Sequence, residues 1–154
     1  MITLLADAIS YAFSLAAHIA GPASRRQLSK FSLAISRDIP HIGTAWAVQF
    51  EDPTRQGSVR LRGIDANLQQ YGRHIRGIGH IQGEPTDLFQ YEGILKRNVF
   101  YGTFWRKNSH VLAGTGTFVL KVNADSRRMT GQCMWYDNTL DDVWLSNYEW
   151  NRKG

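Results

Sequence analysis

From residue 42 to residue 150 the chain alternates apolar and polar residues in one short segment after another. In one such segment Phe118, Leu120 and Val122 fall on the same side of an extended chain. Alternation of this kind indicates a strand with one buried face. We therefore expect eight strands, at residues 42–50, 58–70, 74–82, 88–96, 99–106, 114–122, 128–136 and 143–150.

Short turns join nearly all of these segments, which predicts a consecutive antiparallel meander. A meander of eight strands prefers to close, because closure removes unpaired edges. Glycines recur inside the segments and let a strand bend enough to close a small barrel. Within 58–70 the apolar positions change parity across Gly63, which predicts a β-bulge there. The sequence thus predicts a mainly β chain with a closed antiparallel eight-stranded barrel, and a split sandwich is the alternative fold.

Residues 2–20 are apolar and small, with Asp7 and His18 as their ionisable side chains. Three interpretations compete for this segment. A secretory signal peptide needs basic residues near its start, and no Lys or Arg precedes Arg25. A transmembrane helix needs about 20 apolar residues, which fits the length. An amphipathic helix on a membrane or in an oligomer fits the apolar residues at three- and four-residue spacing.

Gly21-Pro22 ends this helix, and residues 24–36 read as a second short helix or a stalk. We expect residues 1–40 to associate with a membrane or to oligomerise, and residues 41–154 to form the barrel domain. If the first helix spans an inner membrane, the arginines and lysine that follow it place the barrel in the cytoplasm. The single cysteine, Cys133, fits a reducing compartment as a packed thiol. A soluble cytoplasmic protein is the alternative.

The formal charge of +5 comes from basic residues that are scattered, mostly in pairs where turns are expected. The pairs are either solvated turn tips or a basic rim that attracts phosphate. Nucleic acid is not favoured as a partner, because no helix or contiguous run concentrates the charge. The expected partners are a small anionic ligand, membrane lipid and further copies of the chain.

Aromatic residues beside arginines are the best candidates for a ligand site. Tyr and Trp can stack on a base or sugar ring at a barrel mouth, and a guanidinium binds phosphate. Two places in the sequence combine these groups and add a polar amide. The predicted ligand-binding residues are Gln69, Tyr71, Arg73, Arg76, Trp105 and Arg106.

No catalytic motif, metal-ligand spacing or cofactor-binding motif is visible, so we expect no enzyme, no metal and no cofactor. His74 and His80 lie near a turn, where a metal or acid–base role competes with a solvent-facing one. Asp137, Asp141 and Asp142 share one loop, but their spacing lacks the pattern of a calcium loop.

Three segments resemble small calycin-like (lipocalin-like) barrels: LQQYGRHIRGIG at 68–79, YEGILKRNVFYGTF at 91–104, and GTGTFVLKVNADSRRMTGQCMWYD at 114–137. With the apolar N-terminus, the layout resembles the membrane-anchored β-barrel effectors of bacterial antiphage signalling by cyclic oligonucleotides. That resemblance implies an eight-stranded barrel after transmembrane helices, a cyclic dinucleotide as ligand, and an oligomer that disrupts the inner membrane. The family usually has two such helices, whereas this chain offers one segment and a short basic stretch.

The expected function is therefore a membrane-associated receptor or effector whose barrel binds a small anionic ligand, with a cyclic nucleotide as the ligand class, in antiphage defence. Three other functions remain open: a lipocalin-like carrier of an apolar molecule, an enzyme on a calycin-like barrel that uses His74 or His80, and a structural subunit.

Overall fold

A computed structural model describes residues 39–54, 58–107, 114–137 and 140–154 of the chain, and the side chain of Pro85 is not described. The predictions made for residues 2–20 and 24–36 lie outside the described residues. The domain boundary expected at residue 40 therefore stays a prediction.

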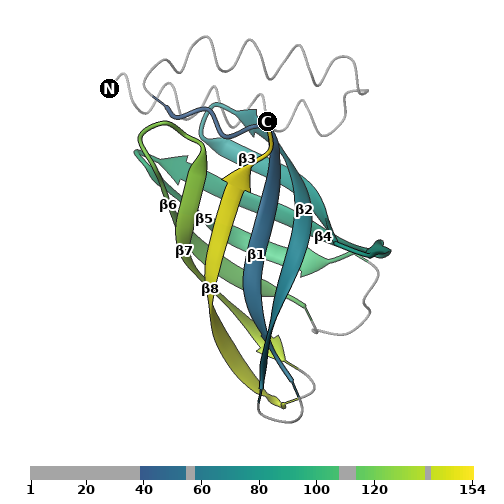
Figure 1. Cartoon of the computed structure of the whole chain (residues 1–154). Coiled ribbons are helices and arrows are strands. Elements are labelled where there is room, and N and C mark those ends of the chain that lie inside the picture. Colours follow the sequence, from purple (N-terminus) through teal and green to yellow (C-terminus); the bar gives the residue numbers. More distant parts are fainter. Residues whose placement is uncertain (1–38, 55–57, 108–113, 138–139) are drawn as a thin grey trace.

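The described chain forms a closed barrel of eight strands (Figure 1). Each strand pairs antiparallel with the next one along the sequence, and β1 closes the ring against β8. This confirms the predicted barrel and rules out the split sandwich. The strands are β1 (Ala45–Pro53), β2 (Val59–Tyr71), β3 (His74–Ile81), β4 (Glu84–Lys96), β5 (Val99–Arg106), β6 (Gly116–Val122), β7 (Arg128–Asp137) and β8 (Asp142–Arg152).

The β3–β4 connection is shorter than the sequence predicts. The strands expected at 74–82 and 88–96 leave a connection between them, but β4 already begins at Glu84 and pairs there with Ile81. The turn consists of Gln82 and Gly83, and Gly83 has a φ of 84°. A residue with positive φ allows a two-residue hairpin turn, so the strands continue to the turn. The register irregularity in this pair lies between His80 and Ile81.

The bulge predicted at Gly63 is wrong. β1 and β2 pair without interruption from Ala45 opposite Asn67 to Pro53 opposite Val59. Side chains in β2 therefore keep a single alternation, because successive residues of a continuous strand point to opposite faces. As a result Leu61 faces outward and is 65% exposed, while Arg62 shares the inner face with Ile64.

One end of the barrel is plugged by its own chain. Gln70 is fully buried; its Oε1 accepts a hydrogen bond from the Ile42 amide at 2.8 Å, and its Nε2 donates to the Pro40 carbonyl at 3.0 Å. Trp46 donates its indole N–H to the Ile42 carbonyl at 2.9 Å. These bonds hold residues 40–42 across the end where β1 begins. Buried aromatic rings pack beneath this plug, including Trp150.

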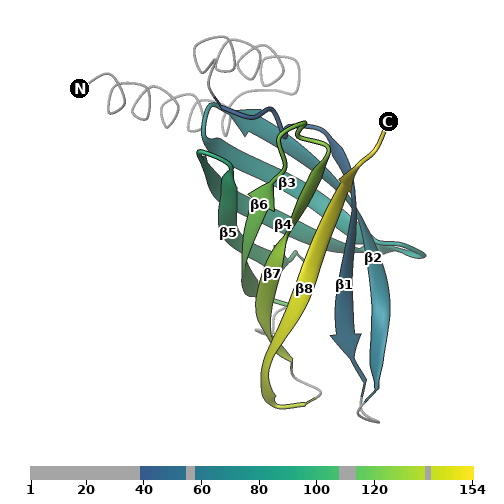
Figure 2. The same ribbon diagram turned by 60° about the vertical axis from the view of Figure 1, so that its left-hand side comes forward.

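At the other end the barrel is open. β1 and β8 pair only from Trp46 opposite Arg152 to Phe50 opposite Tyr148, and the two ribbons separate beyond this point (Figure 2). Side chains replace the ladder there: Ser146 Oγ accepts from the Glu51 amide at 2.8 Å, and the Trp144 indole donates to the Glu51 carbonyl at 3.1 Å. Among the described residues, the unpaired strand ends leave the mouth of the barrel accessible.

Closely packed strands explain two of the glycines inside the barrel. A methyl group at Gly131 in β7 would lie 1.9 Å from the carbonyl oxygen of Val119 in β6. A methyl group at Gly102 in β5 would lie 2.1 Å from the carbonyl oxygen of Glu92 in β4. Both positions need glycine because strand backbone occupies the space that a side chain would fill.

We predict that Gly131→Ala lowers the free energy of unfolding by about 1–3 kcal/mol, because two strands must separate to admit the methyl group. Urea unfolding of the full chain measures the change. Thr130→Ala, one residue earlier on the exposed face, serves as the control and should leave the midpoint nearly unchanged. Equal midpoints for Gly131→Ala and the wild type would contradict this packing.

Candidate ligand cavity

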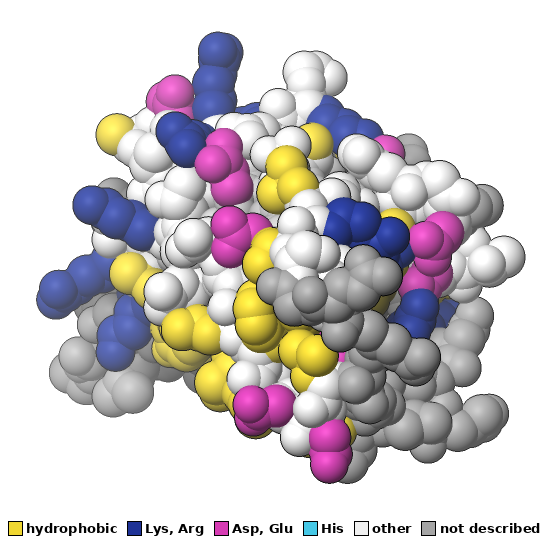
Figure 3. Space-filling model, turned by 60° about the horizontal axis from the view of Figure 1, so that its bottom comes forward, with side chains coloured by type: hydrophobic (Ala, Val, Ile, Leu, Met, Phe, Trp, Pro, Cys, Tyr) yellow, Lys and Arg dark blue, Asp and Glu magenta, His cyan; other side chains and the backbone are white. Residues whose placement is uncertain are grey.

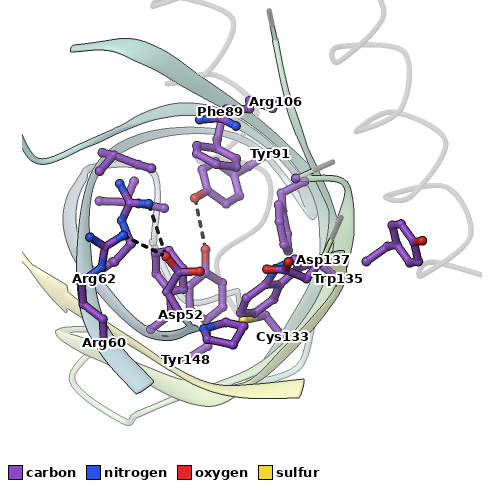
Figure 4. A pocket seen from close by; sticks show the side chains of 17 residues that line it. Asp52, Arg60, Arg62, Phe89, Tyr91, Arg106, Cys133, Trp135, Asp137 and Tyr148 are labelled. Atoms are coloured by element: carbon purple, nitrogen blue, oxygen red, sulfur yellow. Dashed lines mark hydrogen bonds and ion pairs between the residues drawn. The ribbon is translucent and has the colours of Figure 1, made fainter. Parts of the chain in front are cut away.

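The open end of the barrel contains a cavity of about 340 Å³. Its lining comes from seven of the eight strands and from Gly114 before β6, and most of the side chains drawn in Figure 4 point into the ring. This volume lies within the range of about 300–1,000 Å³ that is usual for small-molecule sites. The opposite end is closed by residues 40–42, so the mouth is the entrance to this cavity.

Aromatic and aliphatic side chains form the walls and floor of the cavity. Phe50 and Trp135 meet edge to face on one wall, with ring centroids 5.8 Å apart. Phe89 and Phe104 lie on another wall, with centroids 6.2 Å apart. Such rings offer flat apolar surfaces against which a ring of a ligand can pack.

Two arginines of β2 lie at the mouth beside an aspartate of β1. Asp52 accepts from Arg60 and from Arg62, each at 3.3 Å, and Arg62 also reaches Glu84 at 2.7 Å. The Arg62 side chain is 18% exposed, whereas that of Arg60 is 62% exposed. In Figure 3, which turns the mouth end toward the reader, basic and acidic side chains lie near one another with apolar side chains beside them.

A third arginine approaches the cavity from β5. Arg106 donates through Nε and Nη2 to the two carboxylate oxygens of Asp87, which is 8% exposed. This two-point pairing raises the pKa of the Arg106 guanidinium above its ordinary value. The pair fixes the guanidinium plane at the edge of the cavity.

Cys133 and two tyrosines lie deepest among the polar groups that line the cavity. Burial raises the pKa of the Cys133 thiol to about 12, so the thiol is neutral at physiological pH. Tyr91 and Tyr148 are buried, and their hydroxyls form a hydrogen bond of 3.1 Å. The polarity of the cavity therefore changes with depth, from charged at the mouth to neutral at the floor.

The six residues predicted as a ligand site do not lie around one cavity of the described chain. Arg106 lines the mouth cavity, but the neighbouring Trp105 belongs to the opposite face of β5. Arg76 lies on the outer face of β3 and pairs with Glu92 at 3.0 Å.

The other three predicted residues lie at the plugged end. Tyr71 is buried there and donates its hydroxyl to Gln69 at 3.0 Å. Arg73 belongs to the turn between β2 and β3, where its carbonyl accepts from the Leu95 amide at 2.7 Å. These three residues are not part of the mouth cavity, and a binding role for them stays a prediction.

Most residues of the cavity were not predicted as ligand-binding residues. Arg60, Arg62 and Asp52 were not predicted, although strict alternation along β2 from Ile64 backward would have put both arginines on the inner face. Tyr91, Trp135 and Tyr148 fall within the strands expected at 88–96, 128–136 and 143–150. Their place at the open end depends on which end is plugged, and the sequence pattern gives no signal for that.

The residues considered for metal or acid–base roles are separate from the cavity, with one exception. His74 and His80 belong to the outer face of β3. Asp137 lines the cavity, whereas Asp141 accepts a hydrogen bond from Tyr136. Across the described ranges, no group of three or more His, Cys, Asp or Glu side chains is arranged to hold a metal ion.

Comparison with known protein families finds no match, and comparison with curated proteins finds none either. Within the described residues no helix is long and apolar enough to span a membrane, and the segment 2–20 lies outside them.

We predict that Cys133 in the folded full chain reacts about 100-fold or more slowly with 5,5′-dithiobis(2-nitrobenzoic acid) at pH 8 than in the unfolded chain. The reason is that the thiolate reacts and burial raises the pKa of this thiol to about 12. Release of thionitrobenzoate measures the rate, and guanidinium-unfolded protein is the control. As pH rises past 9, the folded rate should keep rising while the unfolded rate levels off. Similar rates in both states would contradict burial of the thiol.

Proposed function

We propose that the barrel is a non-enzymatic binding protein that takes a small ligand into the mouth cavity. The ligand has a flat apolar body, which packs against the aromatic walls, and an anionic group, which meets the arginines. The observation that carries this proposal is the placement of three guanidiniums around the opening of a cavity lined by aromatic rings. A mostly apolar cavity with a few convergent polar groups is the usual form of a small-molecule site.

The rim charges limit what the ligand gains from its anionic group. Each guanidinium already faces a carboxylate: Arg60 and Arg62 face Asp52, and Arg106 faces Asp87. An incoming anion competes with these carboxylates, so its main effect is to orient the ligand. Burial of the apolar body supplies most of the affinity, at about 25 cal/mol per Å² of apolar surface.

We extend the proposal to a cyclic nucleotide as the ligand class, because its bases are flat rings and its phosphates are anionic. The layout of the chain, an apolar N-terminus before a calycin-like barrel, resembles that of the membrane-anchored β-barrel effectors, and this resemblance supports the extension. The same resemblance supports a role in antiphage defence, as a homo-oligomer at the inner membrane with the barrel in the cytoplasm.

The charge distribution supports the membrane part of this proposal. Basic residues gather in the turns and strand ends of the plugged end, where residues 39–44 lead into β1. Two of them are paired with carboxylates, Arg128 with Glu149 at 2.9 Å and Lys153 with Asp65 at 2.8 Å. Each Lys or Arg near an anionic leaflet contributes about 1 kcal/mol of attraction. This favours an orientation with the plugged end at the lipid headgroups and the mouth away from them. The basic residues are Arg73, Lys96, Arg97, Arg127, Arg128, Arg152 and Lys153.

A carrier of an uncharged apolar molecule is the second candidate. Ile64, Ile81, Phe89 and Phe104 line the cavity with hydrocarbon alone, which favours a ligand without polar groups at that depth. The two candidates differ in whether the ligand uses the arginines.

A displacement assay on the full chain separates the candidates. The fluorescent aromatic anion 8-anilinonaphthalene-1-sulfonate reports occupancy of the cavity, and four competitors are compared: 2-naphthoate, uncharged 2-naphthamide, cyclic di-AMP and a long-chain alcohol. We expect 2-naphthoate to displace the dye and 2-naphthamide to compete more weakly. Competition by cyclic di-AMP supports the nucleotide extension, whereas competition by the alcohol alone supports the carrier. Absence of dye binding and of any thermal shift would overturn both.

We predict that Arg62→Gln weakens binding of 2-naphthoate about 10-fold. A hydrogen bond to a charged group contributes about 1.5–3 kcal/mol, and competition from Asp52 keeps the loss at the low end of that range. The affinity for 2-naphthamide should change little. Arg128→Gln is the matched control, since Arg128 also pairs with a carboxylate but lies at the plugged end. If the two variants bind 2-naphthoate equally well, the rim arginines do not hold the anion.

A further inference from the structure

The floor of the mouth cavity is a pair of tyrosines that spans the barrel. Tyr91 comes from β4 and Tyr148 from β8, which lie on opposite sides of a ring of eight strands. Their hydroxyls meet across the interior at 3.1 Å, as the dashed line in Figure 4 marks. The residues are 1% and 3% exposed, and both line the cavity.

The pair has one more proton than its own hydrogen bond uses. Each phenol carries one O–H donor, so the pair holds two protons. One proton lies in the bond between the two oxygens, and either oxygen can be its donor. Among the described residues no other acceptor bonds either hydroxyl. One O–H therefore remains available, and leaving such a buried donor unsatisfied is costly.

An anion does not suit this position. Aromatic rings surround the pair: the Trp150 ring lies 5.2 Å from that of Tyr91 and 5.6 Å from that of Tyr148, and Phe104 lies 6.2 Å from Tyr91. The arginines are at the mouth, so a charge at the floor would be buried without a cation. Burial also raises the pKa of both tyrosines, so the phenols stay neutral. A neutral acceptor satisfies the remaining proton without burying a charge.

We propose that the Tyr91–Tyr148 pair selects ligands whose buried end carries a neutral hydrogen-bond acceptor, such as a carbonyl oxygen or a ring nitrogen. This inference rests on the proposed function and defines its ligand further. The ligand enters with its acceptor toward the floor, its flat body between the aromatic walls, and its anionic group toward Arg60, Arg62 and Arg106. The two tyrosines are then specificity-determining residues.

A pair of nearly isosteric anions tests the selection. In 6-acetyl-2-naphthoate a carbonyl stands opposite the carboxylate, and in 6-isopropyl-2-naphthoate a second methyl group replaces that oxygen. Displacement of 8-anilinonaphthalene-1-sulfonate from the full chain gives both dissociation constants. We expect the wild type to prefer the acetyl compound about 5- to 10-fold, the effect of one neutral hydrogen bond.

The proton count makes a sharper prediction for variants. Tyr91→Phe or Tyr148→Phe alone removes one proton and also the bond that used one, so each single variant still offers one O–H. We expect both single variants to keep the preference for the acetyl compound. The double variant Y91F/Y148F has no proton to offer and should bind the two compounds equally. A merely structural role would weaken both compounds together in every variant.

The outcomes separate this inference from the proposed function. If neither compound displaces the dye from the wild type, the proposed function fails. If both displace it with equal affinity, the cavity binds ligands but the selection by the tyrosines is wrong. A preference that persists in Y91F/Y148F also overturns the selection. Circular dichroism and binding of the isopropyl compound verify that the double variant is folded. If it is not folded, the ratio of the two dissociation constants in the wild type decides whether the tyrosines select the acceptor.

Discussion

The closed backbone ladder is the constraint on which the rest of the structure depends. Because β1 pairs with β8 as well as with β2, no strand can slip by one residue without breaking the ring. The ladder therefore decides which side chains face the interior. It puts Arg62 of β2 on the same inner face as Ile64 and leaves Leu61 exposed. Hydrophobicity alone would favour the opposite arrangement, with Leu61 inside and Arg62 outside. The charged mouth follows from ring closure rather than from local preference.

The two ends of the ring differ because, within the described ranges, the chain covers one of them and not the other. Gln70 satisfies backbone groups of residues 40–42 and holds that segment across one end. At the other end the β1–β8 ladder stops at Phe50, and Ser146 and Trp144 bond Glu51 through their side chains. One end thus becomes core, and the other becomes a cavity. Along the barrel axis the polarity of the interior side chains increases, from packed aromatic rings at the plugged end, through the neutral tyrosine pair, to the ion pairs at the mouth.

Much of the fold could be predicted from the sequence, because period-2 alternation and short turns are local signals. All eight strands, and the inward face of Phe118, Leu120 and Val122, agree with that pattern. The cavity could not be predicted in the same way. Arginines that face inward near a mouth break the apolar alternation of β2 and resemble a bulge at Gly63. Of the predicted ligand residues, Arg106 lines the cavity, whereas Tyr71 lies at the plugged end. Local patterns could not predict which end is plugged, because the plug depends on a hydrogen bond between Gln70 and Ile42, which are 28 residues apart.

The proposed function requires that the ligand binds inside the open end of the barrel. The five tryptophans report on this directly, because they lie in different places. Trp135 lines the cavity, Trp150 lies under its floor, Trp144 is at the β1–β8 seam, Trp46 is at the plugged end, and Trp105 belongs to the outer face. A titration of the full chain with 2-naphthoate, followed by the indole signals in ¹H–¹⁵N spectra, gives five independent readings. Binding in the mouth cavity predicts the largest shift at Trp135 and little change at Trp46 and Trp105. The largest shift at Trp105 or Trp46, with Trp135 unchanged, would contradict it.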